Sequence, residues 1–158
     1  MRVEDLIDTI GGKRVSPGAG AAGAVTLALA AACAAKAAAI SLNHQPENAG
    51  LRQSQDILER IARFALAGAD RDADAFTAFI KVHTPGAIAQ LIREGDKIVH
   101  LIDVLAGVLD KVAPQIEANM SGDIIAARAL MDAARTIQMT NLAEVEGEKA
   151  TVGLDPKG

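Results

Sequence analysis

The sequence predicts an all-α protein, an antiparallel up-and-down bundle of about four long helices with a short helix before it. Three observations support this prediction. Alanine, the best helix former, supplies 33 of the 158 residues. Aromatic strand formers are scarce, with three Phe and neither Tyr nor Trp. Apolar residues recur every three to four positions, which is the period of a helix packed on one face.

Helix start and stop signals divide the chain into elements. Gly11 and Gly12 end a short amphipathic segment. Ser16 and Pro17 suit the N-cap and the first position of an Ala-rich helix, which is expected at the centre of the bundle, and Pro114 interrupts a later helix. Helices are therefore expected over about residues 3–10, 17–42, 50–82, 85–112 and 124–142.

One domain is expected to account for most of the chain. The length is sufficient to bury a core, and we predict a single helical domain over residues 1–145 with a flexible tail over 146–158. Small side chains bury little apolar area in a monomer. We therefore expect a homo-oligomer, first of all a dimer, that completes the core between subunits.

Charge and cysteine content limit the classes of binding partner and the cellular compartment. The net charge of −4 and the shortage of aromatic side chains argue against nucleic acid. The single cysteine, Cys33, excludes an intrachain disulfide, which fits the cytoplasm. Residues 19–42 carry only Lys36 as a charge, but they are mostly Ala and Gly and suit a buried helix better than a membrane span. We expect a cytoplasmic protein without a membrane or nucleic-acid partner.

Helical spacing distinguishes one acid from its neighbours. The second long helix carries Asp70, Asp72 and Asp74, and at about 100° per residue only Asp72 falls within the apolar stripe. An unpaired buried charge is costly, so Asp72 is expected to meet another charge, a ligand or water. A structural ion pair and a site role are both open.

The same spacing predicts that Lys36 points inward. Val25, Leu29 and Ile40 define one stripe of the Ala-rich helix, and Lys36 lies in its middle. Lys36 is expected to form a structural ion pair with Asp72, to extend to solvent, or to belong to a site.

The glycine-rich start of the Ala-rich helix, residues 16–20, is a further candidate. Its glycines leave backbone N–H groups open and the helix dipole favours an anion, so the segment suits a carboxylate or phosphate. Capping combined with close helix packing explains the same residues. No metal is expected, because Asp96, His100 and Asp103 share a helix face that lies opposite an apolar stripe.

Four motifs follow one another along the chain. They are Ser16-Pro17-Gly18-Ala19-Gly20-Ala21, Asp70-Arg71-Asp72-Ala73-Asp74-Ala75-Phe76, Asn119-Met120-Ser121-Gly122-Asp123 and Asn141-Leu142. In this order they resemble the cyclodeaminase family, which includes the C-terminal domain of formiminotransferase-cyclodeaminase and stand-alone methenyltetrahydrofolate cyclohydrolases. The resemblance covers about residues 3–145. The chain departs from the family pattern at Ala19, Ala21 and Ala118, and at Lys36, where the family is apolar.

The resemblance implies a folate enzyme of one-carbon metabolism. The family reaction closes 5-formimino-tetrahydrofolate to 5,10-methenyl-tetrahydrofolate with loss of ammonia, and the related hydrolases open the methenyl bridge with water. The implied substrate is a tetrahydrofolate derivative, and no tightly bound cofactor is expected. Both reactions pass through a cationic, tetrahedral carbon centre, which a fixed carboxylate stabilises.

The resemblance also implies roles for individual residues. Asp72 would be the electrostatic or acid–base carboxylate, with Asp123 as the second. The substrate would be bound by Ser16, Pro17, Gly18, Gly20, Asn119, Ser121 and Asn141. Any aromatic wall for a pterin ring must come from Phe64, Phe76 and Phe79.

Two other classes of function remain open from the sequence. An enzyme on the same scaffold could act on another small imine, amidine or carboxylate through Lys36, because burial lowers the pKa of a lysine and makes it more nucleophilic. A non-catalytic helical oligomerisation module would use Lys36 and Asp72 only as a structural ion pair.

Overall fold

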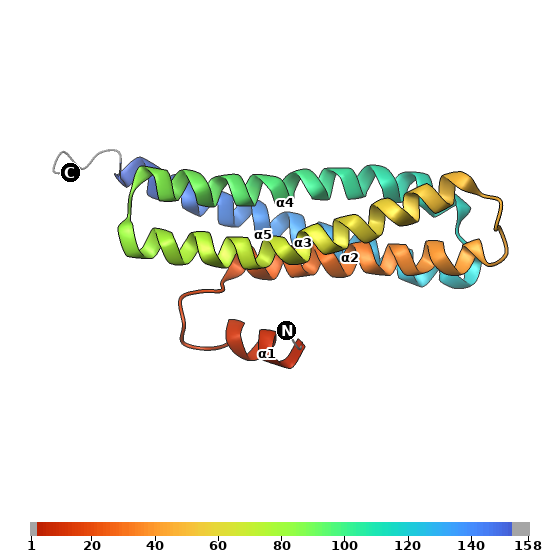
Figure 1. Ribbon diagram of the computed structural model, residues 1–158, viewed down its shortest axis with the longest axis horizontal. Helices are drawn as coiled ribbons and strands as arrows, with labels where there is room; N and C mark the ends of the chain where they lie inside the picture. The colour runs from red at the N-terminus through yellow and green to blue at the C-terminus, as the bar shows by residue number, and fades with distance from the viewer. Residues whose placement is uncertain (1–2, 153–158) are drawn as a thin grey trace.

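A computed structural model describes the backbone of residues 3–152 and the side chains of residues 3–149. It confirms the all-α antiparallel bundle of four long helices with a short helix before it (Figure 1), and no strand is present in this range. The elements are α1 (Val3–Ile10), α2 (Ala19–Leu42), α3 (Ala49–Val82), α4 (Pro85–Val112), the 3-10 turns η1 (Ala113–Gln115) and η2 (Ala118–Met120), and α5 (Ser121–Val152).

Side-chain caps fix the start of two long helices. The Asn48 side chain accepts a hydrogen bond from the N–H of Leu51 at 2.9 Å and so caps α3. Thr84 caps α4 in the same way, with Pro85 following at the first helical position. Only His83 and Thr84 separate α3 from α4, and His83 makes the tight connection with a left-handed backbone of φ 47°.

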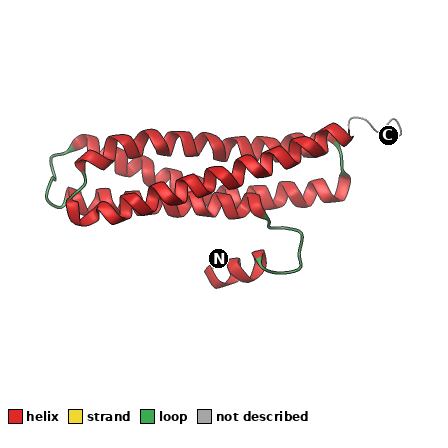
Figure 2. Cartoon of the chain, turned by 180° about the vertical axis from the view of Figure 1, so that it is seen from behind, coloured by secondary structure: helices red, strands yellow, loops and turns green. Residues whose placement is uncertain are grey.

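The Ala-rich helix α2 packs along its length against α3 and α5, and α4 closes the bundle on the far side (Figure 1). Helix α1 lies apart from the bundle in both views and buries none of its residues (Figure 2). Helix α2 is long and apolar enough to cross a membrane by those two measures alone, and 56% of its most apolar window is buried in the bundle. The core helix of a soluble bundle passes the same test.

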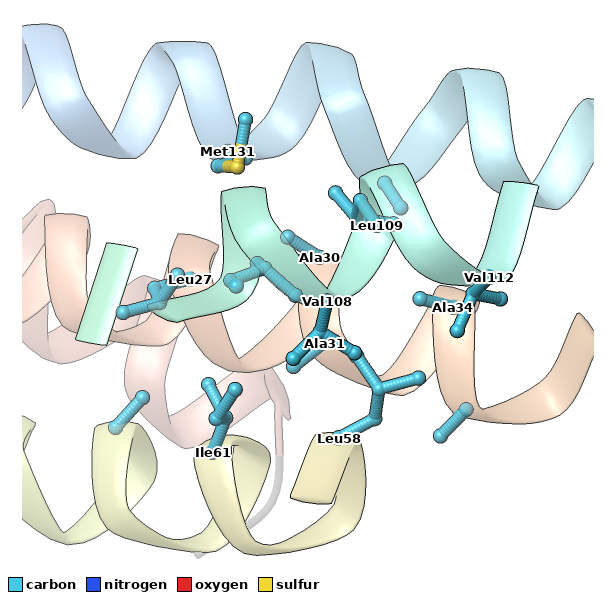
Figure 3. Close-up of a cluster of buried hydrophobic side chains, with 14 of the residues drawn as sticks. Leu27, Ala30, Ala31, Ala34, Leu58, Ile61, Val108, Leu109, Val112 and Met131 are labelled. Carbon is cyan, nitrogen blue, oxygen red and sulfur yellow. The ribbon is translucent and has the colours of Figure 1, made fainter. Parts of the chain in front are cut away.

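Alanine makes the core of this bundle narrow. The small side chains of α2 let the larger aliphatic residues of its neighbours approach its backbone closely (Figure 3). The residues that meet there are Leu27, Ala30, Ala31 and Ala34 of α2, Leu58 and Ile61 of α3, Val108, Leu109 and Val112 of α4, and Met131 of α5.

The predicted inward face of α2 is wrong. Leu29 is 53% exposed, and the Lys36 side chain on the same stripe is 60% exposed. The inward face is instead built mostly of alanines, because only small residues fit where α2 approaches α3 and α5. The larger aliphatic side chains on the predicted stripe were therefore a poor guide to the buried side of this helix.

The last helix continues ten residues past its predicted end at Leu142. Val145 is buried against Phe79, Ile88 and Leu91, so it holds the polar segment after Leu142 to the bundle. The division into a domain over 1–145 and a tail over 146–158 stays a prediction, and residues 153–158 lie outside the described part of the chain.

Candidate active site

A cavity of about 460 Å³ opens at the end of the bundle where α3 turns into α4. Gly18 and Gly20 reach it from the start of α2, Asp72 from α3, and Asn141 from α5. These four residues were all predicted as site residues from the sequence. The volume is within the usual range for a small-molecule site.

Asp72 lines this cavity and is buried, with 6% of its surface exposed. Its carboxylate accepts a hydrogen bond from the backbone N–H of Ala21, in the first turn of α2. The N-cap residue of α2, Gly18, has no side chain to offer, so Asp72 supplies the cap from a neighbouring helix. Ala21 contributes only its backbone N–H to this contact.

The pKa of Asp72 is raised from 3.8 to about 6. Burial is the main cause, because it disfavours the charged form. The Ala21 N–H works in the opposite direction, and the negative charge of Glu94 adds to the increase. A carboxyl group with a pKa near neutrality is suited to proton transfer and to binding a cation.

Gly20 is required by the close approach of Asp72 to α2. A Cβ atom at this position would lie 2.5 Å from Asp72 Oδ2, a separation at which α2 and the carboxylate could not both stay in place. Capping and close packing therefore account for this glycine. The anion at the helix start is the protein's own carboxylate.

Ser16 does not cap α2, so that prediction is wrong. Its hydroxyl donates a hydrogen bond to the carbonyl of Ala73 at 3.0 Å and ties the segment before α2 to α3. The helix begins at Ala19, two residues after the predicted first position at Pro17. Ser16 and Pro17 are half-buried beside the cavity-lining Gly18 and support its position.

One wall of the cavity is aromatic. The Phe76 and Phe79 ring centroids lie 6.2 Å apart, and the His83 ring centroid lies 5.0 Å from that of Phe79. Phe64 is elsewhere, on an exposed groove between α3 and α4. Two of the three phenylalanines in the chain thus line the same cavity as Asp72.

Sequence reasoning missed three titratable side chains that line the cavity. His83 continues the inward stripe of α3 at the helix end, a position that by itself indicates a structural histidine or a helix cap. Glu144 and Glu148 lie on the part of α5 beyond its predicted end. Their i, i+4 spacing, continued from Asn141 at i−3, is the signal that would have placed them on one helix face.

The remaining predicted residues lie at the opposite end of the bundle. Lys36 Nζ donates to Asp123 Oδ1 at 3.0 Å and to Oδ2 at 3.3 Å, so the predicted ion pair between Lys36 and Asp72 is wrong. Lys36 follows Gly20 by sixteen residues of continuous helix, which is about 24 Å along the axis. Asn119 and Ser121 are exposed at that same far end. Within one chain, these residues do not meet the cavity.

The sequence profile of the formiminotransferase-cyclodeaminase family matches residues 2–148. The chain belongs to this family. Among solved structures it is similar to formiminotetrahydrofolate cyclodeaminase from Thermotoga maritima, with a TM-score of 0.76 and 20% sequence identity over 96% of this chain and 84% of the other. A comparison with curated proteins gives no match. The described cavity therefore lies in a cyclodeaminase-family bundle.

Proposed function

We propose that this protein is an enzyme of folate one-carbon metabolism that closes 5-formimino-tetrahydrofolate to 5,10-methenyl-tetrahydrofolate and releases ammonia, or hydrolyses the methenyl bridge. The observation that carries this proposal is the buried Asp72 carboxylate that lines a cavity with an aromatic wall. Membership of the formiminotransferase-cyclodeaminase family supports the choice of substrate.

The proposed chemistry needs a carboxylate beside a cationic carbon. In ring closure, N10 of the substrate attacks the protonated formimino carbon, and a new C–N bond forms. The proton on N10 must leave that nitrogen, and the amino nitrogen must gain one before its bond to carbon breaks and ammonia departs. Asp72 would accept the first proton and pass it to the amino nitrogen, and its ionised form would stabilise the cation before that transfer.

The cavity walls suit the rest of such a substrate. Phe76 and Phe79 offer a flat apolar surface for a pterin ring. The Asn141 amide on α5 can both donate and accept hydrogen bonds at the ring edge. Gly18 and Gly20 leave room at the start of α2 because they carry no side chain.

A spectroscopic assay tests the proposal. The protein is mixed with 5-formimino- or 5,10-methenyl-tetrahydrofolate, and the methenyl chromophore is followed as it forms or disappears. Wild type is expected to turn over at least one of the two. Asp70→Asn and Asp74→Asn are matched controls, because both side chains are exposed on the other side of α3, and both should retain turnover while Asp72→Asn loses it. Turnover at the wild-type rate by all three variants would reject the role of Asp72.

A second candidate is a related enzyme that acts on a smaller amidine or imine. The cavity favours this alternative in one respect, because Asp72, Glu144 and Glu148 make it acidic and no lysine or arginine among the described residues lines it. In that case the protein would convert the smaller substrate with release of ammonia, and it would turn over neither of the two folates. Lys36 lies outside this cavity and is bound to Asp123, so borohydride trapping is expected to give no adduct on Lys36.

We further propose that the protein acts as a cytoplasmic homodimer. The outer stripe of α2 is largely apolar, with Val25, Leu29 and Cys33 at its centre, whereas the outer face of a bundle helix is normally polar. A second copy of the chain would cover this stripe. The only charge on it, Lys36, is already bound to Asp123 of the same chain.

A further inference from the structure

Gln138 is a buried polar residue on α5 with a specific contact at the candidate site. It is 1% exposed, and its Nε2 donates a hydrogen bond to the carbonyl oxygen of Gly20 at 2.7 Å. That carbonyl belongs to the same peptide group as the Ala21 N–H, and the Ala21 N–H donates to the Asp72 carboxylate. One peptide group of α2 therefore connects a side chain of α5 to the carboxylate of α3.

We propose that Gln138 is a positioning residue that holds the Gly20–Ala21 peptide group and, through it, the Asp72 carboxylate. The role rests on the proposed function, in which Asp72 is the reacting carboxylate. Gln138 does not line the cavity and acts only through the peptide group.

Two glycines of α2 make room for the two ends of this connection. A Cβ atom on Gly20 would lie 2.5 Å from Asp72 Oδ2, and a Cβ atom on Gly23 would lie 2.7 Å from Gln138 Nε2. In the rest of α2 the inward positions are mostly alanine, which is the better helix former. Glycine thus replaces alanine at the two points where a polar side chain approaches this turn of the helix.

The cost of burying Gln138 argues against a purely packing role. Its Oε1 atom is buried and has no hydrogen-bond partner within the described part of the chain. A buried amide with one unpaired atom is less favourable than an apolar side chain of the same shape. Methionine or leucine would fill this core position at lower cost, so the donated hydrogen bond is the property that distinguishes glutamine here.

The connection has a definite electrostatic consequence. A hydrogen bond to the carbonyl polarises the peptide group and strengthens its N–H as a donor. A stronger donor favours the ionised carboxylate, so Gln138 opposes the effect of burial on the Asp72 pKa.

Within the described part of the chain, Gln138 forms no hydrogen bond with the other charged groups that face Asp72. These groups are Glu94 on α4 with its partners Arg71 and Lys97, Glu144 and Glu148 on α5, and His83 at the end of α3. Helix α2 brings no charged side chain to this end of the bundle, because its only charge is Lys36. A change confined to Gln138 therefore reports on the peptide group alone.

The test is a carbon-13 NMR titration of the Asp72 carboxyl group, assigned with Asp72→Asn. Gln138→Met keeps the side-chain volume and removes the donor. Gly23→Ala moves the Gln138 amide without removing it and gives a second variant should the first fail to fold. Met131→Leu, another core change on α5, is the matched control. We expect both test variants to raise the Asp72 pKa by about half a unit or more, while the control leaves it unchanged.

The same titration separates this inference from the proposed function. The backbone amide signal of Ala21 should follow the Asp72 titration in wild type and change in Gln138→Met. A shifted titration in a protein that turns over neither folate would uphold the connection and reject the folate activity. An Asp72 pKa equal in wild type, Gln138→Met and Gly23→Ala would overturn the connection, whatever the turnover.

Discussion

At the scale of single residues, Asp72 is a group whose ionisation works against folding. Its pKa is about 6 in the folded protein and 3.8 in the unfolded chain. The folded state therefore binds the proton more tightly, and the stability that this proton provides is present below pH 3.8 and is lost as the pH rises through 6. The increase in pKa corresponds to about 3 kcal/mol.

Asp72→Asn is therefore expected to stabilise the protein at pH 8 by up to about 3 kcal/mol and to have little effect at pH 4. The asparagine amide keeps an oxygen that can accept from the Ala21 N–H. Urea unfolding at the two pH values measures the difference. A loss of stability of equal size at pH 4 and pH 8 would contradict the effect of burial on the pKa of Asp72.

Gly20→Ala tests the contact between α2 and Asp72. The new Cβ atom has no space beside the carboxylate, so we expect a loss of turnover by about 100-fold or more despite alanine's better helix propensity. Gly107→Ala on α4 is the matched control, because nothing lies within 4 Å of its added Cβ. The control should keep full turnover and gain up to about 1 kcal/mol of stability. Two variants with equal turnover would contradict the close contact.

The sequence was sufficient to find Asp72 and insufficient to place Lys36, for one physical reason. Helical spacing identifies the buried face of α3 because large residues such as Leu58 and Ile61 mark it. On α2 the buried positions are mostly alanine, and the large aliphatic Leu29 is exposed. Where two helix backbones approach closely, the buried positions hold small residues. The spacing of the large apolar residues therefore selects the wrong side of α2.

At the scale of elements, the ion pair between α2 and the start of α5 is expected to be minor. Lys36 and Asp123 meet at the far end of the bundle, and the lysine is largely exposed. Lys36→Met and Asp123→Asn should each leave turnover unchanged and alter stability by less than about 1 kcal/mol. Assays of the methenyl chromophore and urea unfolding check both statements. A large loss of turnover with either variant would mean that this end of the bundle takes part in the reaction.

The elements also show where sequence patterns stop being informative. Caps and breakers such as Thr84 and Pro85 predict the helix ends because they act locally. The extension of α5 depends on Val145, which is buried only because α3 and α4 meet it. The order of motifs along the chain likewise contains no information on which end of an antiparallel bundle each one reaches. Asn119 and Asp72 therefore belong to the same set of motifs but lie at opposite ends of the bundle.

At the scale of the whole molecule, the apolar outer stripe of α2 leads to a prediction about assembly. Leu29→Asp is expected to convert a dimer to a monomer, because it places an unpaired charge in the proposed interface. Phe64→Asp is the control, since Phe64 is similarly exposed but lies on the groove between α3 and α4. Light scattering coupled to gel filtration gives the mass. A monomeric wild type, or a dimer that survives Leu29→Asp, would contradict the proposed interface.

The central claim is that a buried, ionisable Asp72 drives chemistry in the cavity at the α3–α4 end of the bundle. The most direct test is the pH dependence of methenyl-tetrahydrofolate formation or loss in wild type and Asp72→Asn. Wild-type turnover should increase as the pH rises through about 6, when Asp72 ionises. Asp72→Asn should lose about 100-fold or more and show no such rise. Turnover by Asp72→Asn at the wild-type rate, with the same pH profile, would contradict the claim.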